Sequence, residues 1–140
     1  FNSGLGMLRQ VYFSMMDLYL HSHEMKSEED ILKVQKDFSD RYLVTPRVDE
    51  DRFLCSFSHI FAGGYSAGYY SYKWAEIMSS DAFSLFEEYD MDDKVKMNEI
   101  GMKFRNSVLS LGGGTEPSKV FEQFRGRKPT VDALLRHNGL

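Results

Sequence analysis

The residue types best suited to chemistry gather in residues 57–74, where three glycines stand among four tyrosines and a histidine. Glycines allow close backbone approach, and phenol hydroxyls are neutral donors at pH 7. Tyr65, Tyr69 and Tyr72 stand at i, i+4 and i+7, so they would share one helical face if a helix began that early. Such hydroxyls could bind the backbone of an extended ligand or stabilise an oxyanion. Spacing alone favours the plainer interpretation, amphipathic core residues with solvated tips.

The four histidines do not follow a metal-binding pattern. His21 and His23 are two residues apart, so on a helix they point to different faces and cannot chelate one ion. We expect both at the exposed end of a helix, where the helix dipole favours them. The run from His23 begins like the zinc protease signature His-Glu-x-x-His, but Ser27 stands where the second histidine must be. His137 is expected to be solvated, and no metal ligand set is predicted in this chain.

Length and composition predict one globular, soluble domain. The chain has 140 residues, 42% of them hydrophobic, and its longest apolar stretches are far shorter than the ~20 residues of a membrane-spanning helix. The net charge is −4, and the 17 Lys and Arg are dispersed, which argues against a nucleic-acid partner. The single cysteine, Cys55, cannot close an internal disulfide.

Apolar residues recur at helical spacing through most of the chain, which predicts an all-α protein of about six helices. The expected helices run over residues 4–21, from Ser27 to before Pro46, over residues 67–88 and 98–109, from Thr115 as N-cap to before Gly126, and from Pro129 to Gly139. Residues 46–61 follow no period for long, which predicts an irregular segment against the core. Gly139 is expected in the left-handed conformation.

Residues 57–76 and 81–83 closely resemble the C-terminal region of the thimet oligopeptidase and oligopeptidase A family of zinc metallopeptidases, and the oligopeptidase A branch most of all. The tail is similar to that family's ending at Leu111–Gly114, Phe124–Pro129 and Asp132–Leu135. The opening, residues 1–21, is similar to the helix that precedes a long loop in that branch. The resemblance covers nearly the whole chain and is weakest over residues 88–99.

The resemblance implies a helical segment of a larger, two-lobed, zincin-type metallopeptidase that cleaves short peptides in a channel between its lobes. In that family, His-Glu-x-x-His and a downstream glutamate bind zinc, and the motif glutamate activates water. All of these would lie before Phe1, so residues 1–140 would be the C-terminal part of the catalytic domain. The bare start at Phe1 fits an excised piece, and the chain alone is predicted to be inactive.

By matching positions, the resemblance assigns this chain the family's glycine-rich substrate loop. His59 would hold or orient the substrate backbone, and Tyr65 would line the site. Tyr72 would donate its hydroxyl to the oxyanion of the tetrahedral intermediate, and Tyr69 would help to position the substrate. Three glycines would let the loop close over peptide and open for release: Gly63, Gly64 and Gly68.

The expected partners are short peptides and the remainder of the parent polypeptide, with neither nucleic acid nor membrane among them. The expected compartment is the cytoplasm, or an organelle if a transit peptide precedes the chain. The alternative is a stand-alone helical module that binds peptides or a partner without chemistry, because the zinc motif is missing. The wide apolar faces of the expected helices also predict that the isolated chain self-associates.

Overall fold

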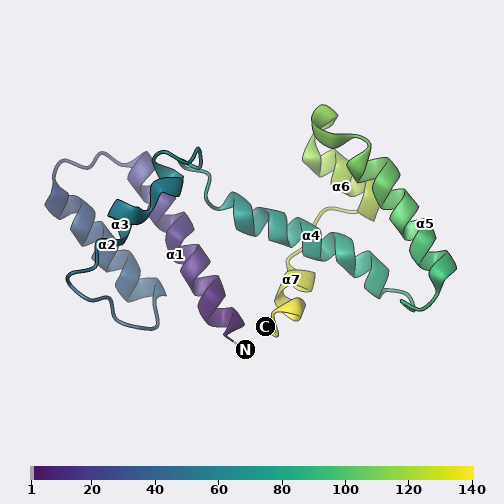
Figure 1. Ribbon diagram of the computed structural model, residues 1–140, viewed down its shortest axis with the longest axis horizontal. Helices are drawn as coiled ribbons and strands as arrows, with labels where there is room; N and C mark the ends of the chain where they lie inside the picture. The colour runs from purple at the N-terminus through teal and green to yellow at the C-terminus, as the bar shows by residue number, and fades with distance from the viewer. Residues whose placement is uncertain (1) are drawn as a thin grey trace. The chain divides into compact units, whose positions relative to one another are not determined.

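The computed structural model describes residues 2–140, which form helices and no strand, as the all-α prediction requires (Figure 1). Phe1, on which the expectation of an excised start rests, lies outside the described residues. The chain divides into two compact units, one from the N-terminus to Lys73 and the other from Trp74 to Leu140. Within the described range, no helix is both long enough and apolar enough to cross a membrane.

The first unit is built on two helices that pack against each other, followed by shorter turns. Its elements are α1 (Ser3–Ser22), α2 (Glu28–Tyr42), α3 (Phe53–Ser56) and the 3-10 turn η1 (Ser58–Ile60). The core combines the inner face of α1 with the segment around η1: Tyr12, Phe13, Met16, Phe57, Ile60 and Tyr69. Phe13 packs its ring face to face on Phe53, with 4.8 Å between the centroids. The core therefore joins α1 to residues 53–69.

The start of α2 follows the sequence prediction at Ser27. The Ser27 hydroxyl accepts a hydrogen bond from the backbone N–H of Asp30, and the Asp30 carboxylate accepts one from the N–H of Lys26. Two backbone donors that the helix cannot use are thereby satisfied. Three acidic residues in the first turn add a favourable interaction with the helix dipole.

The second unit contains most of α4 (Ser71–Glu87), whose first turn still belongs to the first unit. It continues through α5 (Lys94–Phe104), the π-helical turn η2 (Arg105–Leu109), the 3-10 turn η3 (Gly112–Gly114), α6 (Pro117–Arg125) and α7 (Asp132–His137). α6 packs against η2, and the Phe124 ring meets the Phe104 ring edge to face at 5.2 Å. The buried apolar residues here are Ile100, Val120, Phe121, Phe124, Ala133 and Leu134.

Two predicted helix starts are wrong by several residues. α4 begins at Ser71 rather than at Ala67, because Ala67 has φ +53°, a left-handed conformation that a helix cannot contain. α5 begins at Lys94 rather than at Asn98, because the Asp93 carboxylate accepts hydrogen bonds from the N–H groups of Val95 and Lys96 and so caps the helix there.

Of four further expectations, three need correction and one is confirmed. Residues 46–61 include α3 and η1 and are therefore not wholly irregular. Glu116, not Thr115, is the N-cap of α6, and α7 begins at Asp132, because the residues just after Pro129 make tertiary contacts instead of a helical turn. Gly139 has φ +70°, as expected.

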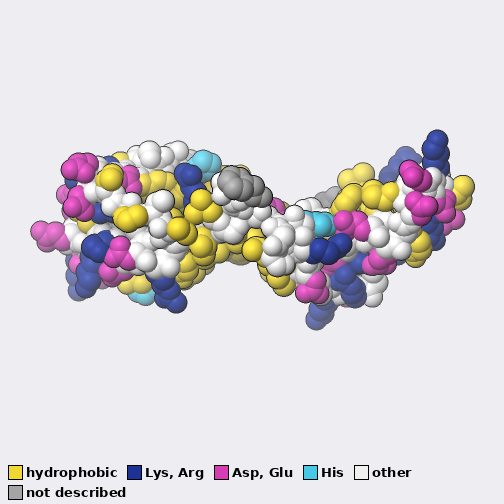
Figure 2. All heavy atoms as spheres, turned by 90° about the horizontal axis from the view of Figure 1, so that it is seen from below, with side chains coloured by type: hydrophobic (Ala, Val, Ile, Leu, Met, Phe, Trp, Pro, Cys, Tyr) yellow, Lys and Arg dark blue, Asp and Glu magenta, His cyan; other side chains and the backbone are white. Residues whose placement is uncertain are grey.

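Large apolar side chains are exposed in both units. Figure 2 shows hydrophobic atoms at the surface on the face drawn. The most exposed examples are Val44, Val48, Leu109 and Val95, each with roughly two thirds or more of its surface in solvent. Exposed apolar side chains mark interaction surfaces where they gather into a contiguous patch.

Candidate functional site

The four aromatic site residues of the sequence prediction lie together in the first unit. His59 is on η1, Tyr65 and Tyr69 are in the loop that follows, and Tyr72 is in the first turn of α4. The His59 ring lies 6.0 Å from each of the Tyr65 and Tyr69 rings. The Tyr65 ring stacks on the Tyr72 ring at 5.2 Å, and the Tyr69 ring meets the Tyr72 ring edge to face at 5.1 Å. We call these four residues the aromatic cluster.

The aromatic cluster does not arise from the helical spacing proposed for it. Since α4 begins at Ser71, Tyr65 and Tyr69 precede the helix and cannot share its face with Tyr72. The loop brings the rings together by folding back on itself instead. The N–H of Tyr65 donates to the carbonyl of His59, and the N–H of Gly68 donates to the carbonyl of Tyr65.

The three predicted loop glycines have different surroundings. A Cβ atom on Gly63 would lie 2.8 Å from the Cα of His59, so no larger residue fits without moving the backbone. Gly64 has φ +80°, which a side chain disfavours. A Cβ on Gly68 would meet only ordinary contacts, the nearest at 3.5 Å. Gly63 is therefore required for the compact loop, whereas Gly68 is not required on steric grounds.

The members of the aromatic cluster differ in their access to solvent. Tyr69 is only 8% exposed and belongs to the core, whereas Tyr65 and Tyr72 are 36% and 38% exposed, and His59 is exposed too. A hydrogen bond with Tyr65, together with partial burial, raises the pKa of Tyr72. Burial also raises the pKa of Tyr69, against the opposing effect of a hydrogen bond with Gln10. Both hydroxyls therefore keep their protons at neutral pH and can act as hydrogen-bond donors.

Asp17 is a residue of this site that the sequence prediction missed. It lies on α1 with its side chain fully buried, and its carboxylate accepts hydrogen bonds from the N–H groups of Ala67 and Tyr69 at 2.8 and 2.9 Å. The available signal was a charged residue next to Met16 and four residues after Phe13, on the apolar face of the helix. The loop of the aromatic cluster is thus attached to α1 through a carboxylate.

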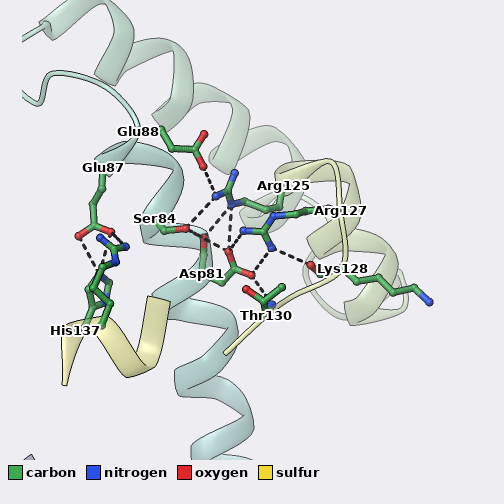
Figure 3. Close-up of polar contacts among 10 residues, drawn as sticks. Asp81, Ser84, Glu87, Glu88, Arg125, Arg127, Lys128, Thr130 and His137 are labelled. Carbon is green, nitrogen blue, oxygen red and sulfur yellow. Dashed lines mark hydrogen bonds and ion pairs between the residues drawn. The ribbon is translucent and has the colours of Figure 1, made fainter. Parts of the chain in front are cut away.

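The second unit holds a separate polar cluster centred on Asp81. Figure 3 shows the guanidinium groups of Arg125 and Arg127 converging on its carboxylate. Arg127 donates to both carboxylate oxygens at 2.6 Å, and the N–H of Thr130 donates to one of them at 2.7 Å. Arg125 also pairs with Glu88. These contacts join two stretches that carried the family resemblance, residues 81–83 and 124–129.

The charges in this polar cluster stabilise the ionised carboxylates. Burial alone would raise the pKa of Asp81, but the hydrogen bonds from Arg127 and Thr130 and the arginine charges outweigh it and lower that pKa. The hydrogen bond to Asp81 raises the pKa of Arg127. Nearby, a hydrogen bond from His137 lowers the pKa of Glu87. Because these acceptors are paired within the protein, we interpret the cluster as structural. It holds the C-terminal segment, residues 125–137, against α4.

The histidines lie apart from one another. His21 and His23 are exposed at the end of α1, as predicted. The Nδ1 atom of His21 approaches Asp17, and the His23 ring stacks on Tyr19. His137 is not simply solvated, because its Nε2 lies 2.9 Å from the Glu87 carboxylate. Among residues 2–140, no group of three or more His, Cys, Asp or Glu side chains could hold a metal ion.

Known proteins resemble this chain along its whole length. The sequence model described as Peptidase family M3 matches residues 1–140. A probable cytosolic oligopeptidase A of Arabidopsis thaliana is 55% identical over 141 residues, which are 100% of this chain and 20% of that protein. An organellar oligopeptidase A of the same plant is also 55% identical, over 100% of this chain and 18% of that protein. The oligopeptidase A of Escherichia coli (strain K12) is 42% identical over 142 residues, with 100% and 20% covered.

The chain therefore spans about a fifth of the length of these curated relatives. Their likeness extends beyond the aromatic cluster to the fastened C-terminal segment, since it covers the chain from end to end. With a family match over all 140 residues and relatives of this similarity, the chain belongs to peptidase family M3.

Proposed function

We propose that this chain is the C-terminal part of the catalytic domain of a zinc-dependent oligopeptidase that hydrolyses short peptides. The observation that carries the proposal is the aromatic cluster, in which two accessible phenol hydroxyls, those of Tyr65 and Tyr72, lie next to an exposed histidine. Membership of the family supports peptide as the substrate class. The relatives named as cytosolic and organellar oligopeptidases favour the cytosol or an organelle as the compartment.

The zinc ion of this proposal does not fit the residues of this chain. The described histidines, cysteine and carboxylates form no group that could bind it. We therefore place the zinc ligands and the water-activating glutamate in a part of the protein outside this chain, and assign this chain only substrate and transition-state contacts. On the same ground we expect residues 1–140 alone to be inactive.

Each member of the aromatic cluster has a proposed role. Tyr72, protonated and accessible, donates its hydroxyl to the oxyanion that forms when the peptide carbonyl is attacked. A donor already aimed at developing charge contributes about 3 kcal/mol of transition-state stabilisation. Tyr65 lines the site and pairs with the Tyr72 hydroxyl until substrate replaces it, and His59 holds the peptide backbone. Tyr69, which is buried, positions substrate indirectly by supporting the Tyr72 ring.

The loop between His59 and Tyr72 is proposed to close over the bound peptide and open for release. Gly63 and Gly64 permit its tight path, and Gly68 is proposed to add backbone freedom to the same loop. This loop and the remainder of the polypeptide would together enclose the substrate.

The test is Tyr72→Phe in the full-length protein, assayed with short fluorogenic peptides. Loss of one oxyanion donor should lower kcat by about 10²-fold while KM changes little, because the hydroxyl acts in the transition state rather than on the bound substrate. Tyr70→Phe is the matched control, since Tyr70 is exposed and neighbours the cluster in sequence without belonging to it. It should retain wild-type kcat.

Two outcomes would contradict the proposal. A Tyr72→Phe variant with unaltered kcat would remove the oxyanion role. A full-length protein that binds short peptides without cleaving them would instead favour the alternative, a non-catalytic peptide-binding module.

A further inference from the structure

The side chain of Asp17 is a buried charge inside the apolar core of the first unit. Its exposed fraction is 0%, and the adjacent Met16 is a core residue. A carboxylate removed from water is strongly disfavoured unless it accepts hydrogen bonds that replace its hydration. The hydrogen-bond partners of Asp17 therefore account for its position in the core.

The partners of Asp17 come from the loop and from its own helix. The N–H of Ala67 donates to Oδ1 at 2.8 Å, and the N–H of Tyr69 donates to Oδ2 at 2.9 Å. The Nδ1 atom of His21 lies 2.9 Å from Oδ1 and 2.8 Å from the backbone oxygen of Asp17. The Asp17 side chain is therefore surrounded by hydrogen-bonding groups from the loop and from α1.

The loop backbone is shaped to meet this carboxylate. Ala67 has φ +53°, which residues with a side chain adopt only where the surroundings hold them. Two N–H groups on either side of Gly68 point at one anion, as in the anion-binding concavities that backbone forms elsewhere. Here the anion is a side chain of the protein itself.

We propose that Asp17 is the positioning residue of the aromatic cluster, acting through the N–H groups of Ala67 and Tyr69. The inference rests on the proposed function, because it states what the held loop is for. The attachment points lie between Tyr65 and Tyr72, so fixing them sets where the two accessible hydroxyls point. Asp17 does not touch substrate in this scheme.

The change Asp17→Asn keeps the size and shape of the side chain but replaces the carboxylate by a neutral amide. A carboxamide keeps one acceptor oxygen but presents an NH₂ group in place of the other. That NH₂ would face an N–H donor, so one of the two loop contacts must be lost. The loop should then sample conformations in which Tyr72 is displaced from the reacting carbonyl.

The experiment compares Asp17→Asn with wild type in the full-length protein by two readouts. In the peptidase assay, kcat should fall by about 10- to 100-fold while KM stays within about threefold, as expected when a reacting group is misplaced. In hydrogen exchange followed by mass spectrometry, peptides covering residues 66–70 should exchange at least about tenfold faster, since they lose a buried acceptor.

Two carboxylates serve as matched controls. Asp40→Asn changes an exposed aspartate on α2 that pairs with Lys36, and should alter neither readout. Asp81→Asn changes a buried aspartate of the second unit, and tests whether any lost buried carboxylate lowers activity. It should leave exchange at residues 66–70 and the kcat of the folded protein near wild type.

The proposal is overturned if Asp17→Asn leaves exchange at residues 66–70 unchanged, or if its kcat falls no further than that of Asp81→Asn. If Asp17→Asn does not fold, His21→Ala replaces it, because this change removes the contact from His21 Nδ1 that orients the Asp17 carboxylate and thereby weakens both loop contacts. It should produce a smaller loss in kcat with faster loop exchange, and no change in exchange would overturn the proposal. A wild-type protein that cleaves no peptide would refute the proposed function. Hydrogen exchange at residues 66–70 would then still test whether Asp17 holds the loop.

Discussion

Asp17 and Asp81, both fully buried, are stabilised by different kinds of donor. Asp17 accepts hydrogen bonds from two backbone N–H groups and lies against His21, whereas Asp81 lies between the guanidinium groups of Arg125 and Arg127. Neutralising Asp17 therefore releases a stretch of backbone. Neutralising Asp81 leaves Arg127 without this counter-ion and Arg125 with Glu88 alone, so we expect it to lower the stability of the fold.

Replacing Asp81 by Asn should destabilise the chain by about 1.5–3 kcal/mol at neutral pH, because hydrogen bonds to a charged partner are lost. Urea titrations at low protein concentration, followed by the fluorescence of the single tryptophan, measure this difference. Asp92→Asn, an exposed aspartate of the same unit, should have no measurable effect.

The stabilising effect of Asp81 should depend on pH in a defined direction. Its pKa is lower in the folded chain than in the unfolded chain, where it is about 3.9. The contribution is therefore fully present above pH ~4 and is lost as the pH falls through the folded pKa. The gap between wild type and Asp81→Asn should close below pH ~4. A gap that is constant down to pH 2 would contradict the charge argument.

For the single residues of the site, the sequence predicts the residue types better than their arrangement in space. His59, Tyr65, Tyr69 and Tyr72 are found together, but by loop folding rather than by helical spacing. The sequence did not predict the role of Asp17, because its partners are backbone N–H groups about fifty residues away. Every residue except proline has such a group, so the residue types at those positions do not indicate the contact. A charge on an apolar face gives a hint of burial but not of the partner.

Single side chains also decide where several helices begin. Asp93 caps α5 by accepting hydrogen bonds from the N–H groups of Val95 and Lys96 at 3.1 and 3.0 Å. Asp93→Ala should destabilise the second unit by about 1 kcal/mol, because two helix donors lose their acceptor. Urea titration again provides the measurement. Asp92→Ala removes a neighbouring carboxylate that does not cap the helix, and an equal loss in that variant would show that the cap is unimportant.

Elements with a strong local signal were predicted well. α1 and α2 agree with the sequence to within a few residues at their ends, because the apolar period and the Ser27 cap lie within the helices themselves. The start of α4 was wrong because the conformation of Ala67 is set by contact with α1, not by neighbours in sequence. Local patterns thus predict helices, and tertiary contacts shift their ends.

Many large apolar side chains of the described residues are exposed, and Figure 2 shows apolar atoms at the surface on the face drawn. Trp74 and Phe61 are each 57% exposed, and Leu109 is 65% exposed. We therefore expect residues 1–140, produced alone, to self-associate as their concentration rises. Light scattering over a concentration series measures this. A monomer that persists at high concentration would contradict the expectation, and Leu109→Glu should reduce association by placing a charge on the exposed surface.

Both units depend on hydrogen bonds that join residues far apart in the chain. Asp17 receives its bond from Ala67 across 50 residues, and Asp81 receives its bond from Thr130 across 49. Helical turns form between near neighbours within about a microsecond. Closing a loop of this length costs conformational entropy before the long-range hydrogen bond can form. The helices of each unit can therefore form early, whereas its buried carboxylates find their partners late. These two long-range closures raise the contact order of the chain, which we expect to slow its folding relative to a helical chain with local contacts alone.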